Sequence, residues 1–128
     1  MKVFVYFNLH KRLFSVRSME GNNKGKVIAH LSYVLLDNPR FKVSKAGRDR
    51  VLRERRKNVH AGVVGDFCTS LLASDKVSWE PVRYNPYLFD SFVDDNKQPV
   101  AFADVAFMQV MPVTKKPLIN IGNYEVQE

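Results

Sequence analysis

Only one stretch of this chain, residues 44–57, has both the length and the residue pattern of an α-helix. Elsewhere the apolar residues occur in short runs separated by Gly, Pro, Asn and Asp, which is typical of strands joined by turns. The segments that favour strands are residues 2–7, 13–18, 26–36, 40–43, 59–67, 77–83 and 100–111.

The chain has 128 residues, enough to bury one core but not two. We therefore expect residues 1–128 to form a single α+β domain. It would be a curved, mainly antiparallel sheet of about six or seven strands with one principal helix. The alternative is a small, partly open β-barrel with the helix at one end.

The helix has recognisable boundaries. Ser44 is a good N-cap, and Asn58 suits the left-handed position after the last turn. Gly47 weakens the helix by about 1 kcal/mol relative to Ala. Gly62 and Gly65 in the following strand indicate a bulge or a close approach of backbone.

Positive charge is concentrated in the first half of the chain. The net charge is +7, but residues 1–60 hold fifteen Lys and Arg against four Asp and Glu, while residues 61–128 hold five against nine. An asymmetry of this size favours contact with nucleic acid or another anionic partner. The alternative is that the two halves pack together and partly neutralise each other.

The helix is the most basic segment, reading SKAGRDRVLRERRK. A turn of about 100° per residue directs its outward face to solvent, and these cations would bind phosphates. The predicted nucleic-acid surface consists of Arg50, Arg53, Arg56 and Lys57, together with Lys11, Arg12, Lys24 and Lys26 from the loops. The alternative is a solvated helix face whose last-turn cations interact with the helix dipole. Arg48 and Arg55 lie beside the apolar stripe, where a buried carboxylate such as Asp66 or Asp104 could meet them.

A second candidate surface is the aromatic segment that follows residue 78. Pro81 and Pro86 stiffen it, and its rings have apolar bodies with polar tips. A protein-interaction site would use Trp79, Tyr84, Tyr87 and Phe89. The alternative is that these rings close one end of the core.

Catalytic and metal chemistry have little support. His60 with Asp66 could act as the general base of a phosphodiesterase or nuclease, although a half-buried structural histidine would give the same pattern. The three histidines and the single cysteine, Cys68, match no metal motif and allow no intrachain disulfide. We therefore predict no metal and no cofactor, and the leading hypothesis is non-enzymatic.

The sequence shows no pattern that is typical of a signal peptide or of a membrane-spanning segment. The apolar run at residues 3–7 is too short for a signal peptide, and residues 27–36 are too few for a membrane span. The sequence thus predicts a cytoplasmic protein that has no membrane partner.

Two short strings resemble known proteins: Arg56-Lys57-Asn58-Val59-His60-Ala61, followed by Gly65, and Tyr84-Asn85-Pro86. They resemble small accessory proteins of tailed bacteriophages. The resemblance implies action in the cytoplasm of the infected bacterium, on nucleic acid or on a host factor. Three hypotheses follow: a nucleic-acid-binding protein, a protein-interaction module that inhibits or redirects a host factor, and a small nuclease using His60.

Overall fold

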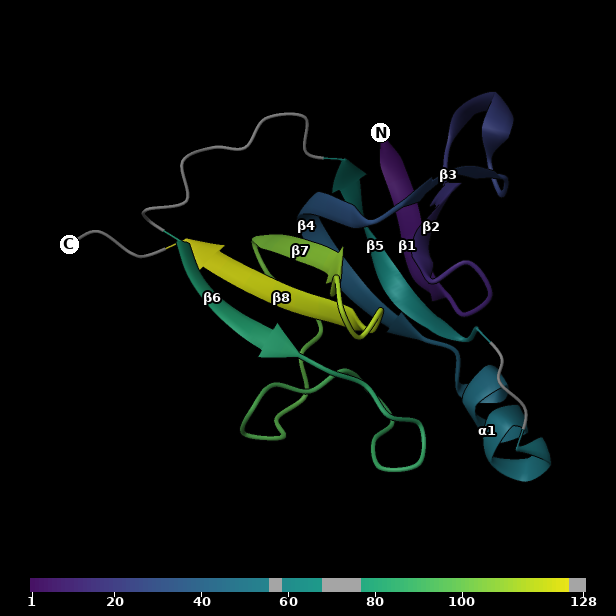
Figure 1. The fold of residues 1–128 in the computed structure, drawn as a ribbon, viewed down its shortest axis with the longest axis vertical. Coiled ribbons are helices and arrows are strands. Elements are labelled where there is room, and N and C mark those ends of the chain that lie inside the picture. Colours follow the sequence, from purple (N-terminus) through teal and green to yellow (C-terminus); the bar gives the residue numbers. More distant parts are fainter. Residues whose placement is uncertain (56–58, 68–76, 125–128) are drawn as a thin grey trace.

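The computed structural model describes residues 1–55, 59–67 and 77–124. Within these residues, eight strands form a single sheet in the order β3-β2-β1-β5-β4-β7-β8-β6 (Figure 1). The strands are β1 (Lys2–Asn8), β2 (Leu13–Ser18), β3 (Val27–Leu31), β4 (Tyr33–Val43), β5 (Ala61–Phe67), β6 (Val77–Val82), β7 (Val105–Val110) and β8 (Pro117–Tyr124). The helices are α1 (Lys45–Glu54) and the short 3-10 helix η1 (Gly21–Asn23).

The predicted α+β class is wrong, because strands make up most of the described residues and α1 has only ten. All neighbouring strands pair antiparallel. The alternative of a partly open barrel is also wrong: β3 and β6 are the two edges of the sheet, and the described strands do not close into a barrel. The protein is therefore mainly an open β-sheet structure with a helix attached at one end.

The sheet curls, and its inner face forms the core. Although β2 is not a neighbour of β4 or β7 in the sheet, it contacts both. The curl brings Val3 and Val16 from one side against Val34 and Leu36 from the other, and all four are 2% exposed or less. Burial of these side chains is the main source of stability that the fold offers.

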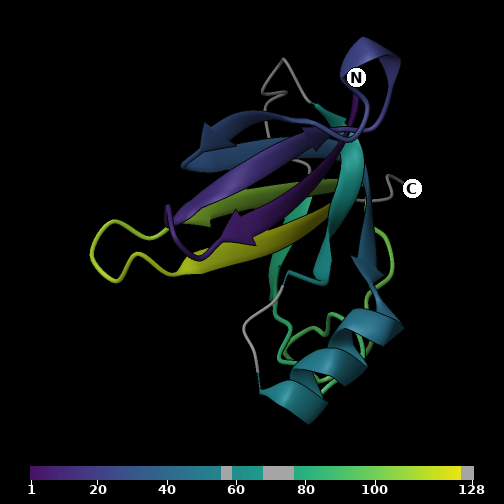
Figure 2. The ribbon, with the colours of Figure 1, turned by 90° about the vertical axis from the view of Figure 1, so that its right-hand side faces the viewer.

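Helix α1 lies where the sequence predicts it, at one end of the curled sheet (Figure 2). The Ser44 N-cap is confirmed, since its side chain accepts a hydrogen bond of 3.2 Å from the Gly47 backbone N–H. The helix ends earlier than predicted: Arg55, not Asn58, takes the left-handed conformation, with φ 54°. Asn58 lies outside the described residues.

The structure differs from the prediction at three further places: around Pro39, at the start of β7 and at β8. Residues 37–39, which separate the predicted strands 26–36 and 40–43, lie inside β4, where a register shift between Asp37 and Arg40 accommodates buried Pro39. Of the strand expected at residues 100–111, only residues 105–110 form β7. Strand β8 was not predicted, although it contains the apolar residues Leu118, Ile119 and Ile121 and pairs with both β7 and β6.

The close approach expected at Gly62 and Gly65 is confirmed. A Cβ atom at Gly62 would lie 2.5 Å from the Val5 carbonyl oxygen and 2.6 Å from the Phe4 ring. At Gly65 it would lie 3.0 Å from the Asp37 carbonyl oxygen. These two glycines let β5 pack closely with its neighbours in the middle of the sheet.

Candidate functional site: an apolar pocket beside the helix

The inner face of the sheet is covered at one end and open at the other. At the open end, beside α1, lies a pocket of about 530 Å³. Its floor is formed by core side chains, namely Val5, Phe14, Val63 and Met108, each of which is 1% exposed. The pocket is therefore a direct continuation of the hydrophobic core toward the surface.

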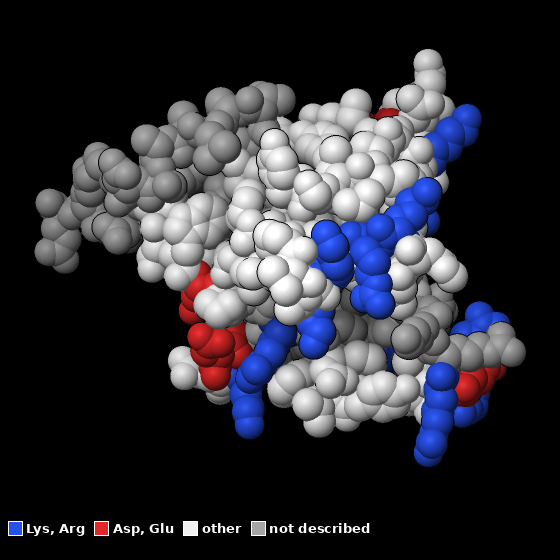
Figure 3. Space-filling model, viewed as in Figure 1, with Lys and Arg blue, Asp and Glu red and all other residues white. Residues whose placement is uncertain are grey.

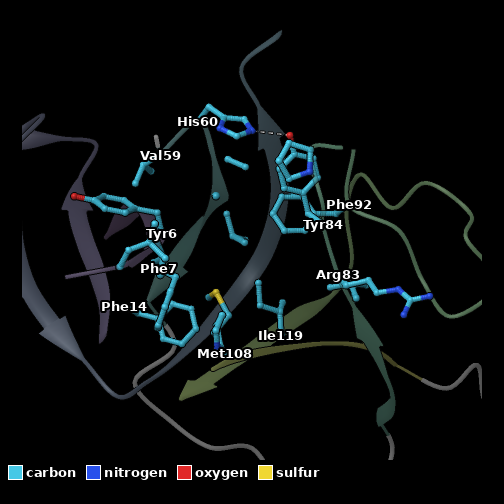
Figure 4. Close-up of a pocket in the computed structure, with 18 of the residues that line it drawn as sticks. Tyr6, Phe7, Phe14, Val59, His60, Arg83, Tyr84, Phe92, Met108 and Ile119 are labelled. Atoms are coloured by element: carbon cyan, nitrogen blue, oxygen red, sulfur yellow. Dashed lines mark hydrogen bonds between the residues drawn. The ribbon is translucent and has the colours of Figure 1, made fainter. Parts of the chain in front are cut away.

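Aromatic rings form one wall of the pocket (Figure 4). His60 precedes β5 and is joined to Tyr84 by a hydrogen bond of 2.7 Å between Nε2 and Oη. The Tyr84 ring lies 5.3 Å from that of Phe92, which in turn lies 4.9 Å from Phe41. On the opposite side, Phe7 meets Phe14 edge to face at 5.5 Å. Flat apolar walls with one polar pair suit a ligand that is mostly apolar.

Burial raises the pKa of the Tyr84 phenol above its ordinary value. The Arg48 guanidinium opposes this effect, and the Asp90 carboxylate adds to it. The phenol is consequently neutral at physiological pH and is held in its hydrogen bond with His60.

The wall is fixed in place by α1. The Arg48 guanidinium Nε donates to the backbone carbonyl oxygens of Pro86 and Phe89, at 3.0 and 2.9 Å. The carboxylate expected near Arg48 is thus replaced by carbonyl groups: Asp104 accepts a bond from the Tyr124 backbone, and Asp66 lies in β5 opposite Lys2. Arg48 acts here as a structural tie between the helix and the aromatic segment.

Gly47 has a comparable role. A Cβ atom at Gly47 would lie 2.5 Å from the His60 Cβ, so only glycine lets α1 pack this closely. The Ser44 backbone N–H also donates to the His60 carbonyl oxygen at 2.7 Å. The residue that weakens the helix in isolation is the one that positions His60 beside it.

The mouth of the pocket is unusually apolar for an exposed surface. Three of its lining residues are large hydrophobic side chains that remain exposed: Leu9 at 43%, Val59 at 44% and Tyr87 at 58%. Leu88, next to Tyr87, is 70% exposed. Exposed apolar groups that gather around a pocket indicate a binding site rather than scattered surface residues.

Basic residues surround this mouth. Arg55 lines it at the end of α1, and no acidic residue is among the described residues that line the pocket. Leu9 is followed in the β1–β2 hairpin by exposed Lys11 and Arg12, and Pro117 is preceded in the β7–β8 hairpin by exposed Lys115 and Lys116.

Both hairpins project on the same side of the molecule (Figure 2). Lys and Arg side chains form a diagonal band over this face, whereas the acidic groups visible there lie at its left edge, beside α1 and in a small patch near the top (Figure 3). A positive potential therefore covers the approach to the pocket.

The structure separates the residues predicted to bind nucleic acid. Arg50 and Arg53 are exposed on α1, and Arg50 forms an ion pair of 3.5 Å with Glu54. Lys11 and Arg12 lie in the β1–β2 hairpin, while Lys24 and Lys26 lie at the opposite end of β2, where Gly25 N–H bonds Ser18. Arg56 and Lys57 lie outside the described residues.

The proposed catalytic pair is likewise separated. His60 precedes β5 and faces Tyr84, whereas Asp66 lies near the far end of that strand, opposite Lys2 and Asp37. Six residues of extended chain span about 20 Å. Among the described residues, no group of three or more His, Cys, Asp or Glu is arranged to hold a metal ion. Cys68 is outside them.

The predicted aromatic site is partly assembled. Tyr84 and Tyr87 line the pocket, and half-buried Phe89 contributes the carbonyl group that Arg48 binds. Trp79 lies apart on edge strand β6, packed over Gly122. Sequence reasoning missed Leu9, Val59 and Arg55 as pocket residues, because only the curl of the sheet brings the β1–β2 hairpin toward the end of α1.

Fold and site together define a small open-sheet protein that has an apolar pocket with a basic surround. The comparison with protein families identifies it further: the model for the Mycobacterium phage L5 gene 82 protein matches residues 1–115, and the chain belongs to this family. The gene 82 protein of Mycobacterium phage L5 is 46% identical over 115 residues, covering 84% of this chain and 90% of that protein. No solved structure matches the chain.

The resemblance to phage proteins is therefore confirmed, and this is a phage protein. The matched region includes α1, β1 to β7 and all but two of the described residues that line the pocket, Pro117 and Ile119. Neither α1 nor any other helix that the structure describes could cross a bilayer, being too short and too polar.

Proposed function

We propose that this phage protein is a protein-interaction module whose pocket captures a bulky apolar side chain from an acidic segment of a partner. The observation that supports this most directly is the mouth of the pocket. Exposed Leu9, Val59 and Tyr87 surround an apolar cavity, and the charged residues that line it are the cations Arg55 and Arg83. In an infected cell, the partner would be a host factor that the phage protein inhibits or redirects.

The size and walls of the cavity support an anchor side chain. A volume of about 530 Å³ exceeds what one Leu, Phe or Trp side chain fills, so the cavity can take such a group together with part of its neighbour. Buried aromatic or aliphatic anchors of this kind carry most of the energy in many interfaces.

The charges around the mouth support an acidic partner. Lys11, Arg12, Lys115 and Lys116 extend from the two hairpins, and Arg55 ends α1. Complementary charges of this kind raise association rates and discriminate between partners more than they add affinity.

The other two hypotheses fit the geometry less well. A nuclease that uses His60 with Asp66 would need the two groups close together, and they lie at opposite ends of β5. A nucleic-acid surface on α1 has less support, because Arg50 is engaged with Glu54 and the loop cations Lys24 and Lys26 lie at the far end of β2.

The proposal can be tested by selecting ligands from a random peptide display library against the wild-type protein. We expect enriched peptides to combine Trp, Phe or Leu with flanking Asp or Glu. One enriched peptide is then measured against Tyr87→Ser, which removes an exposed ring at the mouth, and Tyr124→Ser, a control ring that is 50% exposed outside the pocket. Tyr87→Ser should weaken binding about tenfold, equivalent to about 1.4 kcal/mol, and Tyr124→Ser less than twofold.

Charge is tested with two matched double reversals. Lys115→Glu with Lys116→Glu alters the hairpin beside the pocket, and Lys24→Glu with Lys26→Glu makes the same charge change at the far end of β2. Only the first pair should weaken binding of the acidic peptide, by about tenfold at low salt. Peptides without acidic residues, or equal losses in both pairs, would contradict the proposal.

A further inference from the structure

The outward face of the sheet carries a group of six aromatic and basic side chains, and of these residues only Tyr6 also borders the pocket. We call it the outer band: Phe4, Tyr6, Arg17, Arg40, Lys42 and Phe102. Three of its members are aromatic and three are cationic.

Strand register places four of these residues on one line across the sheet. Arg17 of β2 pairs with Phe4 of β1, Phe4 pairs with Val64 of β5, Val64 pairs with Arg40 of β4, and Arg40 forms a bridge to Phe102. Directly opposite residues share a face of the sheet. Four steps between neighbouring strands make the line about 19 Å long.

The rings and cations of the outer band contact one another. The Arg17 guanidinium lies over the Tyr6 ring, 5.6 Å from its centroid, and that of Arg40 lies over Phe102 at 5.2 Å. The rings of Phe4 and Tyr6 are 5.9 Å apart. Each planar cation is thus held beside an aromatic surface, which limits its side-chain freedom before any ligand arrives.

The three rings are exposed to different degrees: Phe102 is exposed, whereas Phe4 and Tyr6 are half-buried. Gly62, the register partner of Lys42, has no side chain, and the Phe4 ring occupies the space that a Cβ atom there would need. Phe102 is 66% exposed, and Arg40 and Lys42 are exposed. The exposed Phe102 ring and the Arg40 guanidinium over it therefore form the most accessible part of the outer band.

We propose that the outer band binds single-stranded nucleic acid, with unstacked bases on Phe4, Tyr6 and Phe102 and phosphates at Arg17, Arg40 and Lys42. Aromatic platforms with interleaved cations suit single strands, because bases in a duplex are already stacked on each other. The nearest acidic residues on this face, Asp37 and Asp66, pair with each other beyond the register shift in β4. Their negative charge disfavours phosphates at that place, so the expected path of the strand follows the line from Arg17 to Phe102.

The test measures binding of a fluorescent oligothymidine and of a duplex of equal length by anisotropy, at about 50 mM salt. The single strand should bind at least tenfold more tightly than the duplex. Phe102→Ala should weaken single-strand binding about tenfold, because loss of one stacking ring has that effect in similar sites. Tyr124→Ala, which removes an exposed ring elsewhere, should change it less than twofold.

Arg40→Ala tests the electrostatic part. Loss of one phosphate contact should lower the slope of log K against log salt by about 0.7. Its control is Lys97→Ala, an exposed cation in the turn after Asp94, which should leave the slope unchanged. Tyr87→Ser should not affect oligothymidine binding, so failure here and failure of the pocket proposal are distinguishable.

Two outcomes would overturn the inference. One is the absence of oligothymidine binding by folded wild-type protein at low salt. The other is duplex binding as tight as single-strand binding with Phe102→Ala unchanged, because that result would reflect only the net positive charge.

Discussion

The covered and open parts of the inner face are built from the same kinds of residue but differ in what lies above them. In the covered part, Val16 and Leu36 are fully buried because the curl of the sheet brings β2 over β4 and β7. In the open part, Val5, Phe14 and Met108 are just as buried but form the floor of a pocket. The pocket therefore results from incomplete curling of one sheet. Helix α1 and residues 84–92 form a wall of the pocket and do not cover it.

We expect the covered part to determine stability and the open part to determine binding, and substitutions can test this separation. Substitutions in the covered part should change stability and leave binding at the pocket intact when the protein is folded. Substitutions around the mouth should do the opposite.

The largest effect is expected for Leu36→Ala in the covered part. The side chain is 0% exposed, and deleting it should lower the free energy of unfolding by about 2–5 kcal/mol. Chemical denaturation measures this, with Leu88→Ala, next to Tyr87 of the mouth, as the control. Leu88 is 70% exposed, so its truncation should change stability by about 0.5 kcal/mol or less. Equal losses of stability in the two variants would mean that the mouth of the pocket also stabilises the fold, and would contradict this separation.

The next effect is expected for Gly47→Ala, which tests how firmly α1 supports the open part. Alanine favours an isolated helix by about 1 kcal/mol, but its Cβ would lie 2.5 Å from the His60 Cβ. We expect a net destabilisation of about 1–3 kcal/mol, together with weaker peptide binding, because α1 must move away from the aromatic wall. Ala46→Gly, one residue earlier in the helix, is the control: it should cost about 1 kcal/mol and spare the pocket. A stabilised Gly47→Ala protein would show that the contact is easily relieved.

The sequence predicted these two parts unequally. Alternation of apolar residues located β1, β2, β5 and β6, and the capping pattern located α1, because these signals are local. The α+β class failed because β8 was not recognised and the sequence between β2 and α1 gave two strands, one of which runs through Pro39. No local pattern reports a bulge that accommodates a proline, or how far a sheet curls.

The site shows the same limit. The sequence singled out His60, Tyr84 and Tyr87, which the structure brings to one pocket. It placed Arg48 beside the apolar stripe with a carboxylate as partner, and Arg48 instead ties the helix to the aromatic segment through carbonyl groups. Charge runs show where cations are, but carbonyl acceptors supplied by a distant turn leave no trace in the sequence.

A smaller effect is expected from ionisation of Tyr84 at high pH. Because burial raises the pKa of this phenol, the folded protein favours the neutral form more than the unfolded chain does. Its contribution to stability is therefore complete below the ordinary pKa of 10.0 and is lost as pH rises through the higher value of the folded state.

Denaturation curves of wild type and Tyr84→Phe at pH values on either side of 10.0 measure this difference. The variant lacks the hydroxyl that bonds His60 and should be less stable by about 0.5–1.5 kcal/mol near neutral pH, with a shallower decline above it. If the stability of the two proteins declined in parallel with pH, the pKa of Tyr84 would not differ between the folded and unfolded states.

The smallest effect is expected for Arg53→Glu on the outward side of α1, which belongs to neither part of the inner face. The side chain is exposed, so the reversal should change the free energy of unfolding by about 0.5 kcal/mol or less. Peptide binding should also change less than twofold, because the residue does not line the pocket. The informative comparison is Arg55→Glu, two residues along the chain at the pocket mouth, since it makes the same charge change where the acidic peptide must pass. If the two variants weaken binding equally, the binding surface extends over the outward side of α1. The basic residues of the helix would then bind an anionic partner, as the sequence first indicated.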